Sequence, residues 1–122
     1  MSKKEMPNLT ASERRAIDAY VGRLRERFPD EILQAILFGS KARGESGPWS
    51  DIDILTIVKE ESWSLREEIN TLAARVSLEY DVLLGPRVIG QERWLRMERD
   101  RFGLYQNIST EGIPLEPVLA PS

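Results

Sequence analysis

Two apolar segments of seven residues constrain the fold of this chain most strongly. Residues 32–38 read ILQAILF, and residues 52–58 read IDILTIV. Runs of this length and composition favour strands, and the first is apolar enough to be buried on both faces. Both fall far short of the ~18 to 20 residues of a membrane-spanning helix. We therefore expect two neighbouring strands inside a small sheet.

Amphipathic helices are predicted before and after these strands. Thr10 and Glu13 form a capping-box pattern, and apolar residues then recur at the spacing of one helical face, which predicts a helix over residues 11–27. Ser64 and Glu67 form a second capping-box pattern ahead of another periodic segment that reaches Tyr80. Each helix therefore has one apolar face for packing.

The second half of the chain adds a strand and a helix. Residues 81–84 (DVLL) predict a third short strand, and residues 91–108 predict a last helix, although Gly103 weakens that pattern. Residues 112–122 contain three prolines and predict an edge segment or a tail. The order of elements predicts an α/β (α+β) fold with a small mixed central β-sheet flanked by helices.

Composition limits the chemistry that the chain can perform. Its 122 residues suit a single domain, with residues 1–9 as an N-terminal extension and residues 116–122 as a Pro-rich C-terminal tail. It contains no cysteine and no histidine, which excludes thiol nucleophiles, imidazole catalysis and Cys/His zinc sites. Any reaction must therefore use carboxylates, hydroxyls, Lys, Arg or a bound ion.

The charge of the chain bears on its partners and its location. A net charge of −3 argues against a surface that wraps nucleic acid, whereas a small phosphate ligand remains compatible with it. Residues 1–7 lack the apolar core of a signal peptide, and no segment is long and apolar enough to span a membrane. We expect a cytoplasmic protein with no membrane segment and no strong nucleic-acid binding.

Asp51 and Asp53 are the first candidates for a functional site. Side chains two positions apart on a strand project from the same face, so both carboxylates point at one spot. A divalent cation between two carboxylates replaces repulsion with attraction, and their hard oxygen ligands suit Mg²⁺ or Mn²⁺. The alternative is that Ser50 and Asp51 turn the chain into the strand while Asp53 faces solvent, and an isolated pattern of this kind favours that alternative.

Two further positions lie near the predicted carboxylate pair. Gly39 and Ser40 end the first strand, where a glycine permits close backbone approach and free N–H groups can hold phosphate oxygens. Taken alone they would be an ordinary turn, and no Walker motif is present. Asp81 opens the predicted third strand and is a candidate third carboxylate, with a simple helix-to-strand junction as the alternative.

Together these motifs resemble the signature of a known superfamily. The sequence GSKARG at residues 39–44, followed by SDIDIL at residues 50–55, is similar to that of the DNA polymerase β-like nucleotidyltransferases. Within them the chain most resembles the minimal nucleotidyltransferases, over residues 32–81 and again over residues 104–115. The resemblance implies the polymerase β-like nucleotidyltransferase fold. A two-part motif with matching order is more specific than either half.

The resemblance also implies a role for each candidate residue. Gly39 and Ser40 would cradle the triphosphate of ATP, and Asp51 and Asp53 would bind two Mg²⁺ ions. Asp81 would bind one of these ions and help to activate the acceptor hydroxyl. Ions held in this way neutralise the triphosphate and orient it for in-line attack, so the chemistry needs no histidine.

Two residues, one within the first motif and one just before the second, have more than one interpretation. Arg43 is a candidate nucleotide-binding residue, and a salt bridge that shapes the loop is an equal alternative. Trp49, unusually bulky just before the carboxylates, can pack the loop, stack on a base or meet a partner, and loop packing is favoured.

The function implied by the resemblance is transfer of AMP from ATP to a hydroxyl group. Free-standing minimal nucleotidyltransferases resemble the antitoxins of modules whose toxin is a HEPN ribonuclease, so a partner protein is expected to provide the acceptor. One alternative is a catalytically silent antitoxin that acts by binding, and another is a drug-type transferase for small molecules. The oligomeric state, whether homo- or hetero-oligomer, stays open.

Overall fold

A four-stranded mixed sheet forms the centre of the molecule. The computed structural model describes residues 9–44 and 51–115. The strand order is β3-β2-β1-β4, with β1 antiparallel to β2 and β4, and β2 parallel to β3. The strands are β1 (Ile32–Phe38), β2 (Ile52–Val58), β3 (Leu84–Gly90) and β4 (Ile113–Pro114). The small mixed central sheet is confirmed.

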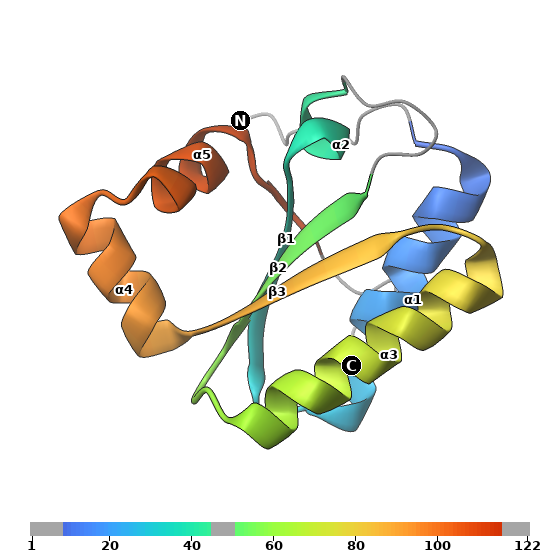
Figure 1. Ribbon diagram of the computed structural model, residues 1–122, viewed down its shortest axis with the longest axis horizontal. Coiled ribbons are helices and arrows are strands. Elements are labelled where there is room, and N and C mark those ends of the chain that lie inside the picture. Colours follow the sequence, from blue (N-terminus) through green and yellow to red (C-terminus); the bar gives the residue numbers. More distant parts are fainter. Residues whose placement is uncertain (1–8, 45–50, 116–122) are drawn as a thin grey trace, which may run out of the picture.

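Helices cover both faces of this sheet. In Figure 1, α1 and α3 lie on one side, α4 and α5 lie on the other, and the short α2 sits at one end of the sheet. The helices are α1 (Ala11–Arg27), α2 (Ser40–Arg43), α3 (Trp63–Tyr80), α4 (Gln91–Asp100) and α5 (Gly103–Glu111). In this three-layer arrangement, α2 lies at the end of the sheet where β1 ends and β2 begins.

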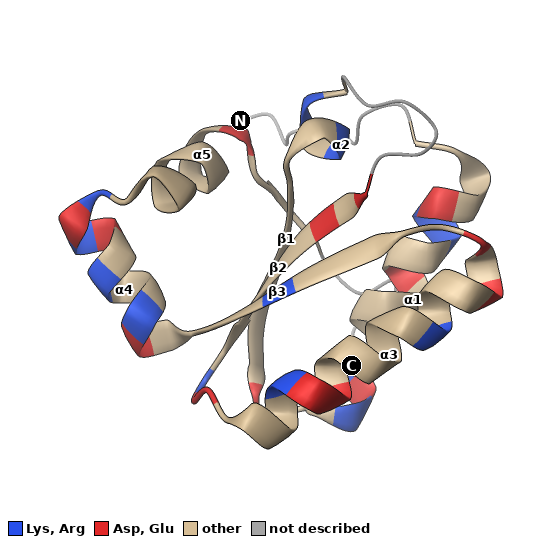
Figure 2. Ribbon diagram, viewed as in Figure 1, with Lys and Arg blue, Asp and Glu red and all other residues tan. Residues whose placement is uncertain are grey.

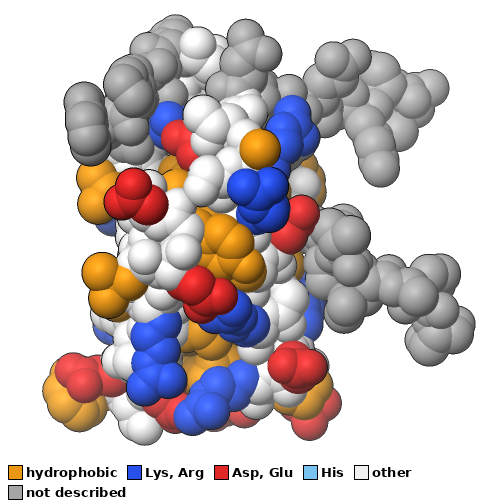
Figure 3. All heavy atoms as spheres, turned by 90° about the vertical axis from the view of Figure 1, so that its right-hand side faces the viewer, with side chains coloured by type: hydrophobic (Ala, Val, Ile, Leu, Met, Phe, Trp, Pro, Cys, Tyr) orange, Lys and Arg blue, Asp and Glu red, His pale blue; other side chains and the backbone are white. Residues whose placement is uncertain are grey.

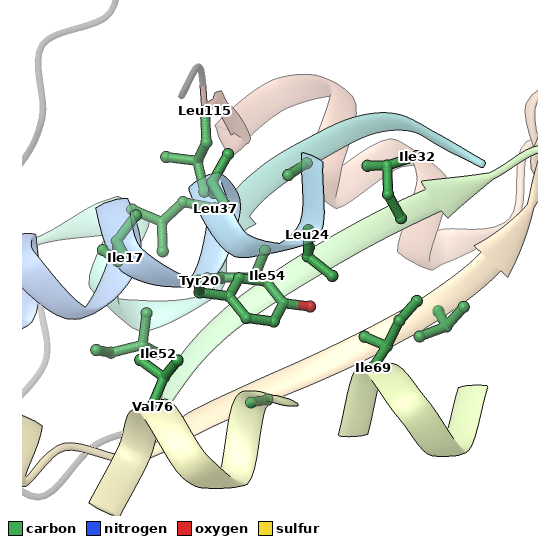
Figure 4. Close-up of a cluster of buried hydrophobic side chains, with 14 of the residues drawn as sticks. Ile17, Tyr20, Leu24, Ile32, Leu37, Ile52, Ile54, Ile69, Val76 and Leu115 are labelled. Carbon is green, nitrogen blue, oxygen red and sulfur yellow. The ribbon is translucent and has the colours of Figure 1, made fainter. Parts of the chain in front are cut away.

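The larger hydrophobic core lies between the sheet and the pair α1 and α3. Tyr20 is fully buried there, and its hydroxyl lies 2.9 Å from the Thr56 hydroxyl, so the one polar group of the ring has a partner. Burial raises the pKa of Tyr20, and the hydrogen bond to Thr56 opposes that shift. Figure 4 shows this core with side chains from α1 (Ile17, Leu24), β2 (Ile52, Ile54) and α3 (Ile69, Val76).

A smaller core lies on the opposite face, beneath α4 and α5. Leu55 and Ile57 of β2 contact this cluster together with Met97 and Ile108 of the two helices. Alternate residues of β2 therefore enter different cores, as strand geometry requires. By the same alternation, Asp53 projects from the face that carries α4 and α5.

The first helix and the first two strands agree with their predicted bounds. Thr10 caps α1 through the hydrogen bond that its side chain accepts from the Glu13 N–H at 3.0 Å, and Glu13 accepts in return from the Thr10 N–H at 2.9 Å. Both bonds of the predicted capping box are present. One expectation for β1 fails near its start: Leu33 and Gln34 are exposed, where a register shift interrupts the pairing with β2.

The third strand begins later than predicted. Asp81 is not its first residue but the C-cap of α3, with a left-handed backbone (φ 56°), and β3 starts at Leu84. Gly85 and Pro86, which follow the predicted strand over residues 81–84, lie inside β3. Proline is tolerated because β3 is an edge strand, where a missing N–H need not break a ladder.

Two helix predictions also need correction. The N-cap of α3 is Ser62 rather than Ser64, because the Ser62 hydroxyl accepts the Leu65 N–H at 3.0 Å. The predicted helix over residues 91–108 is two helices, α4 and α5, because Arg101 adopts a left-handed conformation (φ 55°) that ends α4. The turn lets both helices pack on the same sheet face.

The outer surface of α1 and α3 is polar and of mixed charge. Arg23 pairs with Glu79 at 2.9 Å and Arg27 pairs with Glu68 at 2.7 Å, which joins the two helices. Figure 3 shows basic and acidic side chains interspersed on this side of the molecule. Among the described residues, no helix combines the length and the apolar character that crossing a membrane requires.

Some predictions concern residues outside the described ranges. They are the N-terminal extension up to residue 8, the bulky Trp49, the Ser50 that begins the second motif, and the C-terminal tail over residues 116–122.

Candidate active site

The pairing of β1 with β2 brings the two sequence motifs together. The strands are antiparallel and Phe38 lies opposite Asp53, so the end of β1 meets the start of β2. Gly39 therefore follows β1 directly beside Asp53, with α2 next to it. Figure 2 shows the acidic start of β2 and the basic residues of α2 at the same end of the sheet. The predicted proximity of the two motifs is confirmed.

The contact between Gly39 and Asp53 leaves no room for a side chain. A Cβ atom at Gly39 would overlap the Asp53 Oδ2 atom. The backbone of Gly39 also has φ 79°, a conformation that residues with a Cβ rarely adopt. Glycine is thus favoured here for two independent reasons, the positive φ and the displacement of the Asp53 carboxylate that a Cβ atom would cause.

The carboxylates of Asp51 and Asp53 differ in exposure. Asp51 is exposed and precedes the strand, whereas Asp53 is half-buried inside it. Desolvation raises the pKa of Asp53, the charge of Asp51 raises it further, and Arg87 and Arg43 partly oppose both effects. The charged form of Asp53 is therefore disfavoured until a cation approaches.

The donor set at this position fits Mg²⁺. Magnesium is held in proteins by one or two carboxylates, with waters and substrate phosphates completing its shell. Asp51 and Asp53 supply two such carboxylates at the start of β2, and the pKa of Asp53 is raised by its burial and, to a smaller extent, by the charge of Asp51. Carboxylate oxygens are hard ligands, so this pair suits a divalent cation that arrives with a phosphate ligand.

Asp81 is not gathered with this pair. It is exposed at the end of α3, and within residues 9–44 and 51–115 no three acidic, Cys or His side chains are close enough to hold a metal ion. The neighbour of Asp53 on the parallel strand β3 is Gly85. A Cβ atom at Gly85 would lie 3.3 Å from the Asp53 Oδ1 atom, so a side chain here would face the carboxylate.

Arg43 lies in an ion pair in this structure. Its Nη1 atom is 3.2 Å from the Glu111 Oε1 atom, which ties α2 to α5. The structure therefore shows a salt bridge of Arg43, which was one of its two predicted roles beside nucleotide binding. Arg43 is nonetheless near enough to lower the pKa of Asp53, and its role toward a nucleotide stays a prediction.

Arg87 was missed by sequence reasoning. It pairs with Leu55 in the parallel register, two positions beyond Gly85, so it lies on the face of β3 that matches the face of Asp53 on β2. Its charge lowers the pKa of Asp53, and its side chain lines a cavity of about 400 Å³ with Met97 and Phe102. The position of Arg87 on this face could not be predicted from the sequence, because no strand was predicted over residues 85–90.

Comparison with protein families and curated proteins identifies relatives of this chain. A family model described as a nucleotidyltransferase domain matches residues 17–105. A protein of Methanocaldococcus jannaschii, named as a candidate protein adenylyltransferase, is 32% identical over 83% of this chain and 95% of its own length. Another of the same organism and name is 43% identical over 47% of this chain, and the match spans only 59% of that protein.

Solved structures agree with the fold. A toxin–antitoxin complex with AMP-PNP matches with a TM-score of 0.57 at 22% identity, over 84% of this chain and 73% of the other. The MntA–HepT toxin–antitoxin complex matches with a TM-score of 0.51 at 20% identity, over 86% of this chain and 73% of the other. The family match includes β1, β2 and β3 together with Gly39, Asp51 and Asp53, and it covers well over half of the sequence. The chain therefore belongs to the nucleotidyltransferase-domain family.

Proposed function

We propose that this protein transfers AMP from ATP to a hydroxyl group of a partner protein, with Mg²⁺ held by Asp51 and Asp53. The observation that carries the proposal is the contact between the Asp53 carboxylate and Gly39. It puts a carboxylate directly beside a glycine backbone at the end of a strand, which is what a triphosphate and its cation require together.

Each residue of the site has a defined task in this reaction. Gly39 and Ser40 bind the triphosphate, since no side chain at Gly39 obstructs its approach to the backbone. Asp51 and Asp53 hold the cation, which when bound neutralises the triphosphate and stabilises the departing pyrophosphate. The acceptor oxygen forms a bond to the α-phosphorus, the bond from that phosphorus to the bridging oxygen breaks, and the hydroxyl proton is released to solvent.

The choice of a protein acceptor is supported by the relatives. Both proteins of Methanocaldococcus jannaschii are named for adenylyl transfer to proteins, and two structural neighbours come from toxin–antitoxin complexes, one of them with AMP-PNP. The resemblance to minimal nucleotidyltransferases points to a HEPN-type toxin. We therefore propose that the protein is the antitoxin of such a pair and acts in the cytoplasm, where ATP and Mg²⁺ are available.

Label transfer from ATP tests this proposal directly. The purified protein is incubated with Mg²⁺ and host lysate, once with ATP labelled on the α-phosphate and once with ATP labelled on the γ-phosphate. Transfer of AMP labels a polypeptide only from the α-position, whereas phosphoryl transfer labels it only from the γ-position. The Asp51→Asn/Asp53→Asn variant is the inactive control.

The outcomes separate the candidate functions. A labelled protein band that is lost in the variant and in EDTA supports the proposal and identifies the acceptor. Label on a small molecule instead would favour a drug-type transferase. Co-purification of a partner without any label, with both the wild type and the variant neutralising it, would contradict catalysis and favour a binding role.

A further inference from the structure

A buried ion pair links the first helix to the residues beside the candidate phosphate site. The Lys41 Nζ atom lies 2.6 Å from the Glu13 Oε2 atom, and the two side chains are only 5% and 9% exposed. Glu13 and Lys41 are the two charged residues that are buried within the described ranges. They are 28 positions apart in the sequence, so the contact is created by the fold.

Glu13 is itself held in place by the capping box. One of its carboxylate oxygens accepts the Thr10 N–H while the other contacts Lys41. The same turn of α1 is tied to the end of α3 by the Ser12 hydroxyl, which donates to the Tyr80 carbonyl at 2.7 Å. Burial alone raises the pKa of Glu13, but the bonds from Lys41 and Thr10 outweigh it and lower the pKa. Glu13 is therefore a fixed, charged anchor.

The Lys41 side chain contacts Glu13 inside the protein and does not extend toward the candidate phosphate site. It directly follows Ser40, where a lysine would ordinarily be assigned to the triphosphate, yet its ammonium is buried against Glu13. Burying two charges carries a large desolvation penalty, which an apolar pair of similar volume avoids. A buried ion pair at this position therefore provides a defined geometry more than it provides stability.

The short helix α2 needs such an anchor. It has only four residues, and a single isolated turn is unstable because nucleation fixes several backbone angles for one hydrogen bond. Lys41 holds α2 to α1, while Arg43 holds it to α5 through Glu111. Gly39 and Ser40, immediately before and at the start of α2, are positioned by these two contacts.

We propose that the Glu13–Lys41 ion pair sets the conformation of residues 39–44 for binding the triphosphate, with both residues acting as positioning residues and neither touching the nucleotide. The inference rests on the proposed function, because it assigns the triphosphate to Gly39 and Ser40. Removing either charge breaks the buried ion pair and weakens the attachment of α2 to α1. The loss should therefore appear first in the ordering of residues 39–44 and in the binding of ATP.

Hydrogen exchange and transfer kinetics together test the ion pair. The variants are Glu13→Gln, Lys41→Met, and the double variant Glu13→Gln/Lys41→Met, which leaves no uncompensated charge. Glu79→Gln is the matched control, because Glu79 also bridges α1 to a neighbouring element but through an exposed pair with Arg23. Exchange is measured on the protein without nucleotide, and KM for ATP and kcat are measured by α-label transfer.

The expected result is selective. Amide exchange over residues 39–44 accelerates at least tenfold in all three charge variants, including the double variant, and KM for ATP rises at least tenfold with a smaller change in kcat. Glu79→Gln leaves both values as in the wild type. Unchanged exchange over residues 39–44, or an acceleration spread evenly over the chain, would overturn the proposal, as would wild-type KM in Lys41→Met.

Failure of the proposed function would look different. A wild-type protein that neither binds ATP nor transfers label contradicts adenylyl transfer, and with it the role of the ion pair in nucleotide binding. Exchange over residues 39–44 would still report whether Glu13 and Lys41 hold α2. An active wild type with unaltered charge variants contradicts only the inference about the ion pair.

Discussion

The carboxylate of Asp53 lies against the backbone of Gly39, so closely that a Cβ atom at Gly39 would overlap its Oδ2 atom. The contact follows from the antiparallel register, which places Phe38 opposite Asp53 and so puts the next residue of the chain beside the carboxylate. A small residue at the end of one strand and an acidic residue near the start of the next therefore share one site.

Replacing Gly39 by alanine should inactivate the protein. The methyl group would displace the Asp53 carboxylate, and the left-handed backbone adds strain, so we expect label transfer to fall at least roughly 10²-fold, as a misplacement of about 1 Å can cause. Gly22→Ala is the matched control, since nothing lies within 4 Å of a Cβ atom there. That change in the middle of α1 should raise the unfolding free energy by about 0.5 to 1 kcal/mol. Equal losses of activity in the two variants would contradict this interpretation.

Asp53→Asn should abolish transfer without destabilising the protein. Because the pKa of Asp53 is raised in the fold, its charged form is disfavoured there, and the stability that it contributes declines as the pH rises above its usual pKa. At neutral pH the neutral amide removes this repulsion, so the melting temperature without metal should stay the same or rise. Thermal melts without ligands measure the effect on stability. Melts with Mg²⁺ and ATP measure ligand binding, and only the wild type should gain stability from the ligands.

Asp81→Asn distinguishes a two-carboxylate site from a three-carboxylate site. The structure sets Asp81 at the end of α3 and Gly85 beside Asp53, so we expect the variant to retain transfer within about threefold of the wild type. Asparagine keeps the left-handed backbone that this position needs. A loss as large as that of Asp53→Asn, at an unchanged melting temperature, would restore Asp81 to the catalytic set.

Arg87→Gln should shift the pH dependence of the reaction. Arg87 lowers the pKa of Asp53, so without it that pKa rises further and the carboxylate is charged only at higher pH. The acidic limb of the profile of kcat/KM against pH should move to higher pH. Arg75→Gln, which removes an exposed arginine from α3, should leave the limb in place.

The stability of the protein in acid should depend on Glu13. Its pKa is lowered in the fold, so its contribution to stability is present above the ordinary value of 4.5 and is lost as the pH falls through the lowered pKa. Unfolding free energies measured by denaturant between about pH 3 and pH 7 should therefore decline less steeply in Glu13→Gln than in the wild type. An unchanged slope would mean that Glu13 is equally protonated in both states.

Much of the architecture was predictable because its signals are local. The capping box at Thr10 and Glu13 and the helical period behind it determined α1, and two short apolar runs determined β1 and β2. The one-residue spacing of Asp51 and Asp53 predicted that both project to the same side, since side chains alternate along a strand whatever the surrounding fold; in the structure Asp53 lies in β2 and Asp51 directly precedes it.

The contacts and registers between distant segments depend on how the whole chain packs. Pairing with β2 determined that β3 runs through Gly85 and Pro86, which local preferences count as breakers, and so placed Gly85 rather than Asp81 beside Asp53. The Glu13–Lys41 pair likewise depends on how α1 packs near the end of the sheet. A capping glutamate and a loop lysine have no periodic pattern that relates them, because only the folded chain makes their burial and pairing favourable.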